Sequence, residues 1–282
     1  MNRPIDKPGM GMNQEATSEI DTFTCPNCGA AAAGKACQAC GQKRIRPDEM
    51  SLRHVAGTVV EETLDLDGKL PRTLLDLFFH PGRLTVDFLD GRRQRHIRPI
   101  PLYLMCLALY FFFNHYAPVN LPMLVSQQPA KSPLLQKIDQ RARDAGRTRA
   151  QYVAERNSRY MEVHKTANMV LDVALLGPAL FLLYRRQRPY LAQHLVMTLH
   201  YNSFSYLFGL VPLAVMSVVG VESIPLSVMF LVVNFGYVYL ALRRVYGQGR
   251  GITAVKLSAL VVLNLIAAII GTAGAMIYAL FS

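Results

Sequence analysis

Long apolar segments dominate the chain after residue 99 and are separated by polar connections. A helix that crosses the roughly 30 Å hydrocarbon core of a bilayer needs about 20 predominantly apolar residues. Segments of about this length span residues 100–117, 167–184, 195–219, 224–242 and 255–281. The pattern predicts an all-α polytopic membrane protein, in which about five transmembrane helices form a bundle over residues 100–282.

A shorter amphipathic pattern covers residues 51–91, ahead of the first span. Ser51 is a suitable N-cap for the first helix, and the later pattern stops before Pro81-Gly82 and again at Gly91. Two arrangements fit these juxtamembrane helices. They pack on one another as a small helical domain, or they lie flat on the inner leaflet with their apolar faces in the headgroup region.

Residues 1–24 are polar and lack the apolar core of a secretory signal. We expect them to form a disordered tail. Because no long apolar segment precedes residue 99, the N-terminal third is expected to stay in the cytoplasm, where thiols remain reduced.

Charge is distributed unevenly along the chain. The protein is 51% hydrophobic and only 17% charged, with a net charge of +11, whereas soluble domains average about 25% charged residues. Residues 1–100 carry 14 basic against 13 acidic side chains, but residues 189–242 contain a single charged one, Glu222. This segregation separates a soluble N-terminal third from a membrane-embedded remainder, and the composition excludes a disordered or collagen-like protein.

Basic clusters indicate the orientation of the bundle. The clusters in 92–98, 185–188 and 243–256 flank predicted spans, and the positive-inside rule places them in the cytoplasm. The N-terminus is then cytoplasmic and the C-terminus periplasmic. The connection 118–166 fits this orientation poorly. It is placed on the periplasmic side, yet it carries nine basic against four acidic residues. Its charges are spread along an expected helix, Leu134–Lys165, away from the span ends, so the five-span prediction is kept.

The cluster beside the first span consists of Arg92, Arg93, Arg95 and Arg98 and has no acidic residue. Topology alone accounts for these arginines. They are also candidate contacts for anionic lipids, at about 1 kcal/mol per basic residue near the surface. Nucleic-acid binding is not expected, because the charge is juxtamembrane and no nucleic-acid-binding motif accompanies it.

Four of the five cysteines form two Cys-x-x-Cys pairs, Cys25 with Cys28 and Cys37 with Cys40, each followed by glycine. The spacing lets both thiolates of a pair face one metal ion, and the glycine permits the tight turn around sulfur. A zinc ribbon over residues 25–41 is therefore predicted, with these four cysteines as ligands. Four thiolates fill the tetrahedral shell of zinc, so the ion is expected to be structural rather than catalytic.

Two other interpretations of the cysteines are less consistent with the rest of the sequence. Two disulfides are disfavoured in a cytoplasmic segment. A thioredoxin-like redox site would need a βαβ pattern, which does not surround these pairs. Cys106 lies inside an apolar segment and is expected to be a buried packing residue.

Polar side chains inside the predicted spans are candidate functional groups, because they are costly in a bilayer. His200, Asn202 and Ser203 lie in the first third of the third span, and Asp172 is the acidic residue of the second. These groups line a polar pocket in which His200 takes up protons, or they hold the bundle together by interhelical hydrogen bonds. We favour the second interpretation.

The order of these features resembles a bacterial membrane protein family catalogued as domain of unknown function 3667. The resemblance rests on the cysteine ribbon, on the segment Leu70–Gly82, and on Gly91-Arg92-Arg93 with Pro99 opening a span. It extends from about Cys25 to Leu210 and is most specific over residues 72–99. It implies a zinc ribbon and a helical bundle in the bacterial inner membrane, and it implies no activity.

No nucleophile–base pair, phosphate-binding loop or His-Glu-x-x-His motif is recognisable in the sequence. We therefore expect a non-enzymatic scaffold or adaptor, in contact with membrane lipids, that presents its ribbon to a cytosolic or membrane protein partner. The alternative hypothesis is a small transporter or lipid-handling protein with a polar intramembrane pocket around His200.

Overall fold

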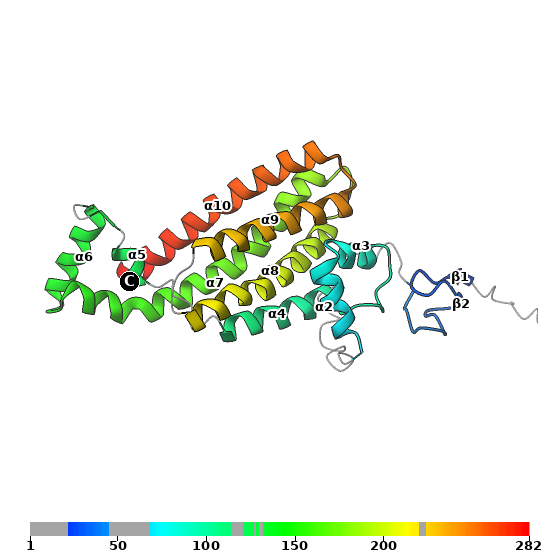
Figure 1. Ribbon diagram of the computed structural model, residues 1–282, viewed down its shortest axis with the longest axis horizontal. Coiled ribbons are helices and arrows are strands. Elements are labelled where there is room, and N and C mark those ends of the chain that lie inside the picture. The colour runs from blue at the N-terminus through cyan, green and yellow to red at the C-terminus, as the bar shows by residue number, and fades with distance from the viewer. Residues whose placement is uncertain are drawn as a thin grey trace, which may run out of the picture.

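The computed structural model describes residues 22–44, 68–113, 121–126, 128–129, 132–219 and 224–281. Within them the protein is mostly helical, with nine helices and one two-stranded hairpin. This confirms the coarse prediction of a helical protein with an N-terminal cysteine hairpin. The hairpin lies at one end of an elongated bundle (Figure 1). Most of the expected tail 1–24, and the first amphipathic helix after Ser51, lie outside the described residues.

The N-terminal hairpin is small. Strands β1 (Thr22–Thr24) and β2 (Ala31–Ala33) pair antiparallel, and an isolated bridge joins Ala36 to Lys43. Units of fewer than about 40 residues cannot bury enough apolar surface to fold alone and usually need a metal ion or disulfides. The stability of this segment therefore depends on its cysteines.

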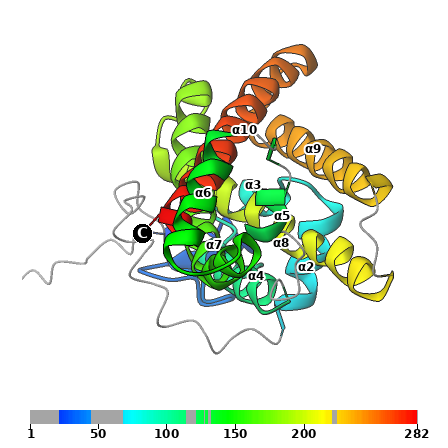
Figure 2. The same cartoon turned by 90° about the vertical axis from the view of Figure 1, so that its left-hand side faces the viewer.

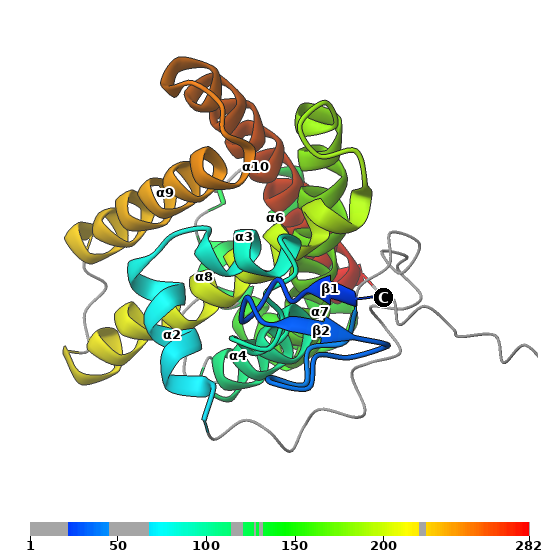
Figure 3. The same cartoon turned by 90° about the vertical axis from the view of Figure 1, so that its right-hand side faces the viewer.

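Helices α2 (Leu70–Phe79) and α3 (Arg83–Leu89) pack against the bundle helices beside the hairpin end (Figure 3). Helix α2 contacts α8, and α3 contacts both α8 and α9. Leu77 and Leu84 are buried in the same apolar core as residues of those bundle helices. Helices α2 and α3 also contact each other, while Leu75 and Phe79 of α2 are exposed. The two arrangements considered for the juxtamembrane helices stay predictions, and the bundle contacts are an addition to both.

Five longer helices coincide in position with the predicted spans. They are α4 (Pro99–Phe113), α7 (Arg149–Tyr184), α8 (Leu191–Val219), α9 (Ile224–Tyr246) and α10 (Arg250–Phe281). Helices α4 and α7 both pack on α8, and α10 packs on α7 and α9. Leu102, Leu180 and Leu242 lie in the main apolar core between them.

In the described part of the chain, two helical segments are long and apolar enough to cross a membrane. They are Val228–Tyr246 and Arg250–Phe281, while Pro99–Phe113 and Val173–Tyr184 are shorter apolar segments. The five-span arrangement and its orientation stay predictions.

The connection 118–166 is built differently from the single helix expected over Leu134–Lys165. Helix α5 (Leu121–Ser126) is followed by α6 (Pro133–Asp144), and the chain turns at Gly146 before α7 begins. Thr148 and Gln151 form a capping box at the start of α7, which fixes the break because the cap satisfies backbone groups that a continuous helix would bond internally. Helix α7 then runs without interruption into the second predicted span.

The end of α10 packs on the connection through a second apolar cluster, to which Ile138 and Ala279 contribute. Tyr152 Oη donates a hydrogen bond to the Leu280 carbonyl at 2.8 Å. Helices α5 and α6 and the end of α10 therefore lie together (Figure 2). The hairpin, α2 and α3 lie at the opposite end (Figure 1).

Candidate functional site

Two turns of similar geometry hold the four predicted ligand cysteines. Gly29 N donates to the Cys25 carbonyl at 2.9 Å, and Gly41 N donates to the Cys37 carbonyl at 2.8 Å. Both glycines have positive φ angles, 77° and 69°, a conformation that side-chain-bearing residues rarely adopt. The glycine after each Cys-x-x-Cys pair is thus required by the turn, as its place in the sequence indicates.

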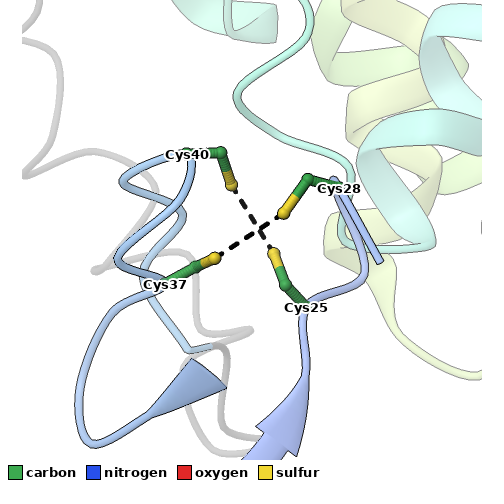
Figure 4. Close-up of side chains that lie close together, drawn as sticks. All are labelled: Cys25, Cys28, Cys37 and Cys40. Carbon is green, nitrogen blue, oxygen red and sulfur yellow. Dashed lines mark hydrogen bonds between the residues drawn. The ribbon is translucent and has the colours of Figure 1, made fainter. Parts of the chain in front are cut away.

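The four thiols converge on one point (Figure 4). Their Sγ atoms all lie within 4.8 Å of one another, and the Cys25–Cys40 and Cys28–Cys37 Sγ pairs are each 3.6 Å apart. A disulfide needs about 2.05 Å. A tetrahedral zinc ion with Zn–S bonds of about 2.3 Å separates its sulfurs by roughly 3.8 Å. The cluster therefore has the geometry to hold a metal ion such as zinc, with all four donors supplied by the chain.

The four thiols have different electrostatic surroundings. A hydrogen bond from the Asn27 side chain is the main cause that lowers the pKa of Cys40, to about 6. The backbone N–H of Ala30 lowers the pKa of Cys28. The hydrogen bond with Cys40, burial and the other thiols outweigh that effect and raise the pKa to about 12. Because a metal ion binds thiolates, its binding releases protons from this cluster.

The structure brings His200 together with α3. The imidazole is 4% exposed, and its Nδ1 lies 2.9 Å from the hydroxyl of Thr85, within hydrogen-bond distance. Met197 Sδ accepts a 3.7 Å contact from the same hydroxyl. The side chain therefore joins a bundle helix to a juxtamembrane helix, as an interhelical hydrogen bond does.

The other polar residues predicted with His200 do not converge on it. Ser203 Oγ donates to the Leu199 carbonyl of its own helix at 2.8 Å. Asn202 is buried, and its Nδ2 has no hydrogen-bond partner among the described residues. Asp172 lies in α7, and its side chain is outside the described set. Neither Ser203 nor Asn202 is hydrogen-bonded to His200 among these contacts, and a pocket that includes Asp172 stays a prediction.

A buried ionic network that the sequence interpretation did not anticipate lies between α2 and α3. Asp76 and Asp87 are each 6% exposed and His96 is 7% exposed. The imidazole Nε2 lies 3.0 Å from Asp87 Oδ2 and 3.6 Å from Asp76 Oδ2. Arg83 pairs with Asp76 at 3.0 Å, and Arg92 pairs with Asp87 at 2.8 Å. Arg83 Nε also lies 3.9 Å from Asp87 Oδ2, so the two carboxylates share Arg83, and the imidazole contacts both of them.

Burial and hydrogen bonding act in opposite directions in this network. Burial raises the pKa of Asp87, but hydrogen bonds from Arg92 and His96 outweigh it and leave that pKa below its ordinary value. Burial lowers the pKa of His96 despite the hydrogen bond to Asp87 and the charge of Asp76. The imidazole is therefore neutral at pH 7, so the network joins α2, α3 and the segment before α4 without an uncompensated positive charge.

A sequence signal for this network does exist. Asp76 follows Thr73 by three residues, so the two share a face of α2 that is buried, and Asp87 lies on the buried face of α3. Carboxylates in such positions are rarely buried without partners. Arg83 and Arg92 follow them at short sequence distances, so both pairs could have been anticipated. The position of His96 depends on the chain reversal after Gly91.

The four arginines predicted to contact anionic lipid have different surroundings. Arg92 pairs with Asp87 and also with Asp90, at 3.1 Å. The guanidinium of Arg93 lies over the Phe88 ring, 4.6 Å from its centroid. Arg98 is half-buried, and Arg95 is exposed. Arg92 is therefore committed to an internal network, while Arg95 keeps an open position at the surface.

A link between the hairpin and the helices also passes through this segment. Arg93 N donates to Gln42 Oε1 at 3.2 Å, and Gln42 is 3% exposed. Gln42 directly follows the second cysteine turn, and its backbone carbonyl accepts a hydrogen bond from Cys37 N. The cysteine cluster is thereby attached to the connection between α3 and α4.

These observations define a helical protein with candidate membrane-spanning helices and an N-terminal four-cysteine cluster suited to a metal ion. Residues 67–111, from the start of α2 into α4, match the family model described as "Protein of unknown function (DUF3667)". The match confirms the resemblance over this segment, which includes Asp76, Asp87 and His96. No curated protein and no solved structure matches the chain.

Proposed function

We propose that the protein is a non-enzymatic adaptor of the bacterial cytoplasmic membrane, and that its zinc ribbon, residues 25–41, binds a protein partner in the cytoplasm. The observation that carries the proposal is the closed four-thiol cluster. Zinc with four thiolate ligands has no open coordination position for a substrate or water. The ion then stabilises a small rigid surface, which suits recognition rather than catalysis.

The faces of α9 and α10 support placement in a membrane. Val232 and Ile270 are each 65% exposed and belong to two helices long enough to cross a bilayer. In the most apolar segment of α10, only 11% of residues are buried within the protein. A contiguous apolar surface of this kind is unfavourable in water and marks a contact with lipid or protein. Lipid therefore provides the natural environment for these two helices.

The distribution of basic segments between the two ends of the bundle supports the proposed five spans and their orientation. The basic segments 92–98, 185–188 and 243–256 adjoin the ends of the bundle helices near α2 and α3, whereas the connection 118–166 lies with the end of α10. Positive charge at the first end favours a cytoplasmic position for the ribbon. The connection then lies in the periplasm, where its charges belong to α6 and the start of α7.

The contacts of His200 favour the adaptor over the transporter or lipid-handling alternative. A transport pathway needs polar side chains that line a cavity. The imidazole of His200 is instead 4% exposed and within hydrogen-bond distance of Thr85. His194 is likewise engaged at both ring nitrogens, by Tyr246 Oη at 2.8 Å and by the Arg188 carbonyl at 2.9 Å.

Replacement of a ligand cysteine tests the proposal. We expect Cys25→Ser to lower bound zinc from about one ion per chain to near zero and to abolish co-purification of a stoichiometric partner. The measurements are elemental analysis and quantitative mass spectrometry of the affinity-purified protein. Cys106→Ser is the matched control, because Cys106 lies in α4 outside the cluster, and it should retain both zinc and partner.

A comparison of two altered proteins in a deletion strain distinguishes the adaptor from the transporter. His200→Ala should retain the partner and restore the phenotype of a deletion strain as well as the unaltered protein does. A protein that lacks residues 25–41 should fail to restore it. Full restoration by the ribbon-deleted protein, combined with failure of His200→Ala, would reject the adaptor and support the transporter.

A further inference from the structure

A strongly basic cavity lies where α7 ends and α10 begins. Its volume is about 330 Å³, and Arg185, Arg186 and Gln187 line it on the α7 side. Gln248, in the turn before α10, and Lys256, in its second turn, line the opposite side. The lining thus contains three cationic side chains and no acidic one. A cavity of this charge and size favours a small anionic group.

The contacts of Lys256 hold its ammonium group at the cavity without neutralising it. Lys256 Nζ donates to the Leu183 carbonyl at 2.6 Å and lies 4.2 Å from the centroid of the Tyr184 ring. Both partners are uncharged. Arg185 and Arg186 take part in none of the ion pairs found among the described residues. The positive charge of the cavity is therefore available to an external anion.

Gln248 adds a polar group of a different kind. Its Oε1 is buried and has no hydrogen-bond partner among the described residues. A buried acceptor without a donor is unfavourable by about 1–3 kcal/mol, and a hydroxyl group of a ligand in the cavity would remove that cost. The cavity therefore suits an anion that also carries a hydroxyl.

The surroundings of the cavity are apolar on the side of the bundle. Leu182 lines the cavity and is 67% exposed, and Val255, next to Lys256, is 72% exposed. Basic pockets beside apolar helix surfaces at the cytoplasmic face of a membrane bind phospholipid headgroups. A water-soluble anion would use the three cations and leave both apolar side chains without a partner.

We propose that this cavity binds the headgroup of an anionic phospholipid. The phosphate lies among Arg185, Arg186 and Lys256, a headgroup hydroxyl donates to Gln248, and the acyl chains run along Leu182. The site is separate from the arginine cluster in 92–98. The inference depends on the membrane placement in the proposed function, but not on the adaptor role.

Lipid binding by the delipidated full-length protein in detergent tests this inference. The probes are phosphatidylglycerol and phosphatidylcholine, added in a titration that is followed by native mass spectrometry. One phosphatidylglycerol should bind more tightly than any phosphatidylcholine. The double variant Arg185→Gln with Arg186→Gln should bind it about thirtyfold more weakly, because each basic side chain near an anionic group contributes about fivefold. Lys256→Gln should weaken binding about fivefold.

The control has the same change in charge at positions outside the cavity. Arg244→Gln with Arg250→Gln removes two exposed arginines nearby and should leave the affinity within about twofold. Equal losses in both double variants, or equal binding of the two lipids, would overturn the proposal. Competition by glycerol 1-phosphate at the affinity of the lipid would overturn the lipid assignment in favour of a soluble phosphate.

The lipid site and the adaptor role fail separately. Cys25→Ser should retain the affinity for phosphatidylglycerol, because the ribbon does not contribute to the cavity. In the unaltered protein, a stoichiometric partner without selective binding of phosphatidylglycerol would overturn the lipid site alone. Selective lipid binding without a partner would overturn the adaptor role alone. A protein that fractionates with the soluble proteins of the cell would overturn both.

Discussion

His96 shows how a single residue links the sequence to the packing of several elements. Its imidazole contacts the carboxylates of Asp76 on α2 and Asp87 on α3. The next backbone amide, Ile97 N, donates to Thr73 Oγ1 at 3.1 Å. The segment before α4 is therefore held against both juxtamembrane helices, and the first bundle helix begins two residues later, at Pro99.

The lowered pKa of His96 predicts a stability that falls on acidification. The folded protein keeps the imidazole neutral, whereas in the unfolded chain it takes up a proton below about pH 6.5. Stability contributed by His96 is therefore complete above that pH and is lost as the pH falls towards the folded-state pKa. Asp87 acts in the same direction below its ordinary value of 3.8. Thermal unfolding in detergent between pH 7.5 and 5 measures the effect.

The variant His96→Gln isolates the contribution of the imidazole, since the amide can still donate to Asp87 but cannot titrate. Its unfolding temperature should decrease less between pH 7.5 and 5 than that of the unaltered protein. The other histidines remain, so the decrease is reduced rather than abolished. His80→Gln is the control, because His80 is largely exposed beside Asp76. An unchanged pH dependence in His96→Gln would contradict this account of the network.

At the scale of elements, the turn between α2 and α3 determines how the juxtamembrane helices meet the bundle. Gly82 has a φ of 77°, and a Cβ atom there would lie 2.9 Å from the Ala241 carbonyl oxygen of α9. Its missing side chain thus allows both the left-handed turn and the close approach of two backbones. The Pro81-Gly82 pair, which predicts only a helix end, also determines a contact with a helix about 160 residues further along the chain.

Substitution of this glycine tests the contact. We expect Gly82→Ala to destabilise the protein by about 2–4 kcal/mol, because it combines backbone strain with a steric clash. Gly247→Ala is a close control: Gly247 also has a positive φ, of 65°, but has open space around its Cβ position. That substitution should cost about 1 kcal/mol, from the backbone alone. Thermal unfolding of the purified proteins compares them, and equal costs would mean that the α3–α9 contact is not tight.

The boundary between α6 and α7 is a feature of the elements that the hydrophobic pattern does not predict. The polar residues in 118–166 and the apolar residues after them predict a loop helix and a separate span, yet α7 covers Arg149–Tyr184 as one helix. Hydrophobic periodicity reports which environment a face meets, and not whether the backbone is interrupted. The interruption between α6 and α7 is instead set by the turn at Gly146 and by the cap at Thr148.

At the scale of the whole molecule, the two ends of the bundle have different partners. One end carries the cysteine hairpin, the ionic network and the basic cavity. The other carries α6 and the end of α10, where Arg141 donates to the Phe281 carbonyl at 3.0 Å. In the proposed orientation, the first end faces the cytoplasm and the second faces the periplasm.

Accessibility to a membrane-impermeant thiol reagent tests this orientation in intact bacteria. Gln140→Cys, on an exposed position of α6, should react in intact cells. Gln187→Cys, in the turn after α7, should react only after permeabilisation. The unaltered protein is the control for the native cysteines. Reaction of Gln187→Cys in intact cells, with protection of Gln140→Cys, would invert the proposed topology.

Features with local causes could be predicted from the sequence alone. The metal cluster follows from two Cys-x-x-Cys-Gly turns, because each turn is formed by consecutive residues and both lie within 16 positions of one another. The approximate positions of the bundle helices follow from the apolar segments, each of which is about as long as a membrane span would need. Neither prediction needs knowledge of which helix packs on which.

Features with non-local causes were decided by the tertiary structure. The partner of His200 is Thr85, at a sequence separation of 115, and Arg185, Arg186 and Lys256 meet only because α10 returns to the end of α7. Sequence patterns show that a side chain is polar and where it lies on its helix. Its hydrogen-bond partner depends on how the helices pack, because in a protein interior each buried polar group takes the complementary group that packing brings within reach.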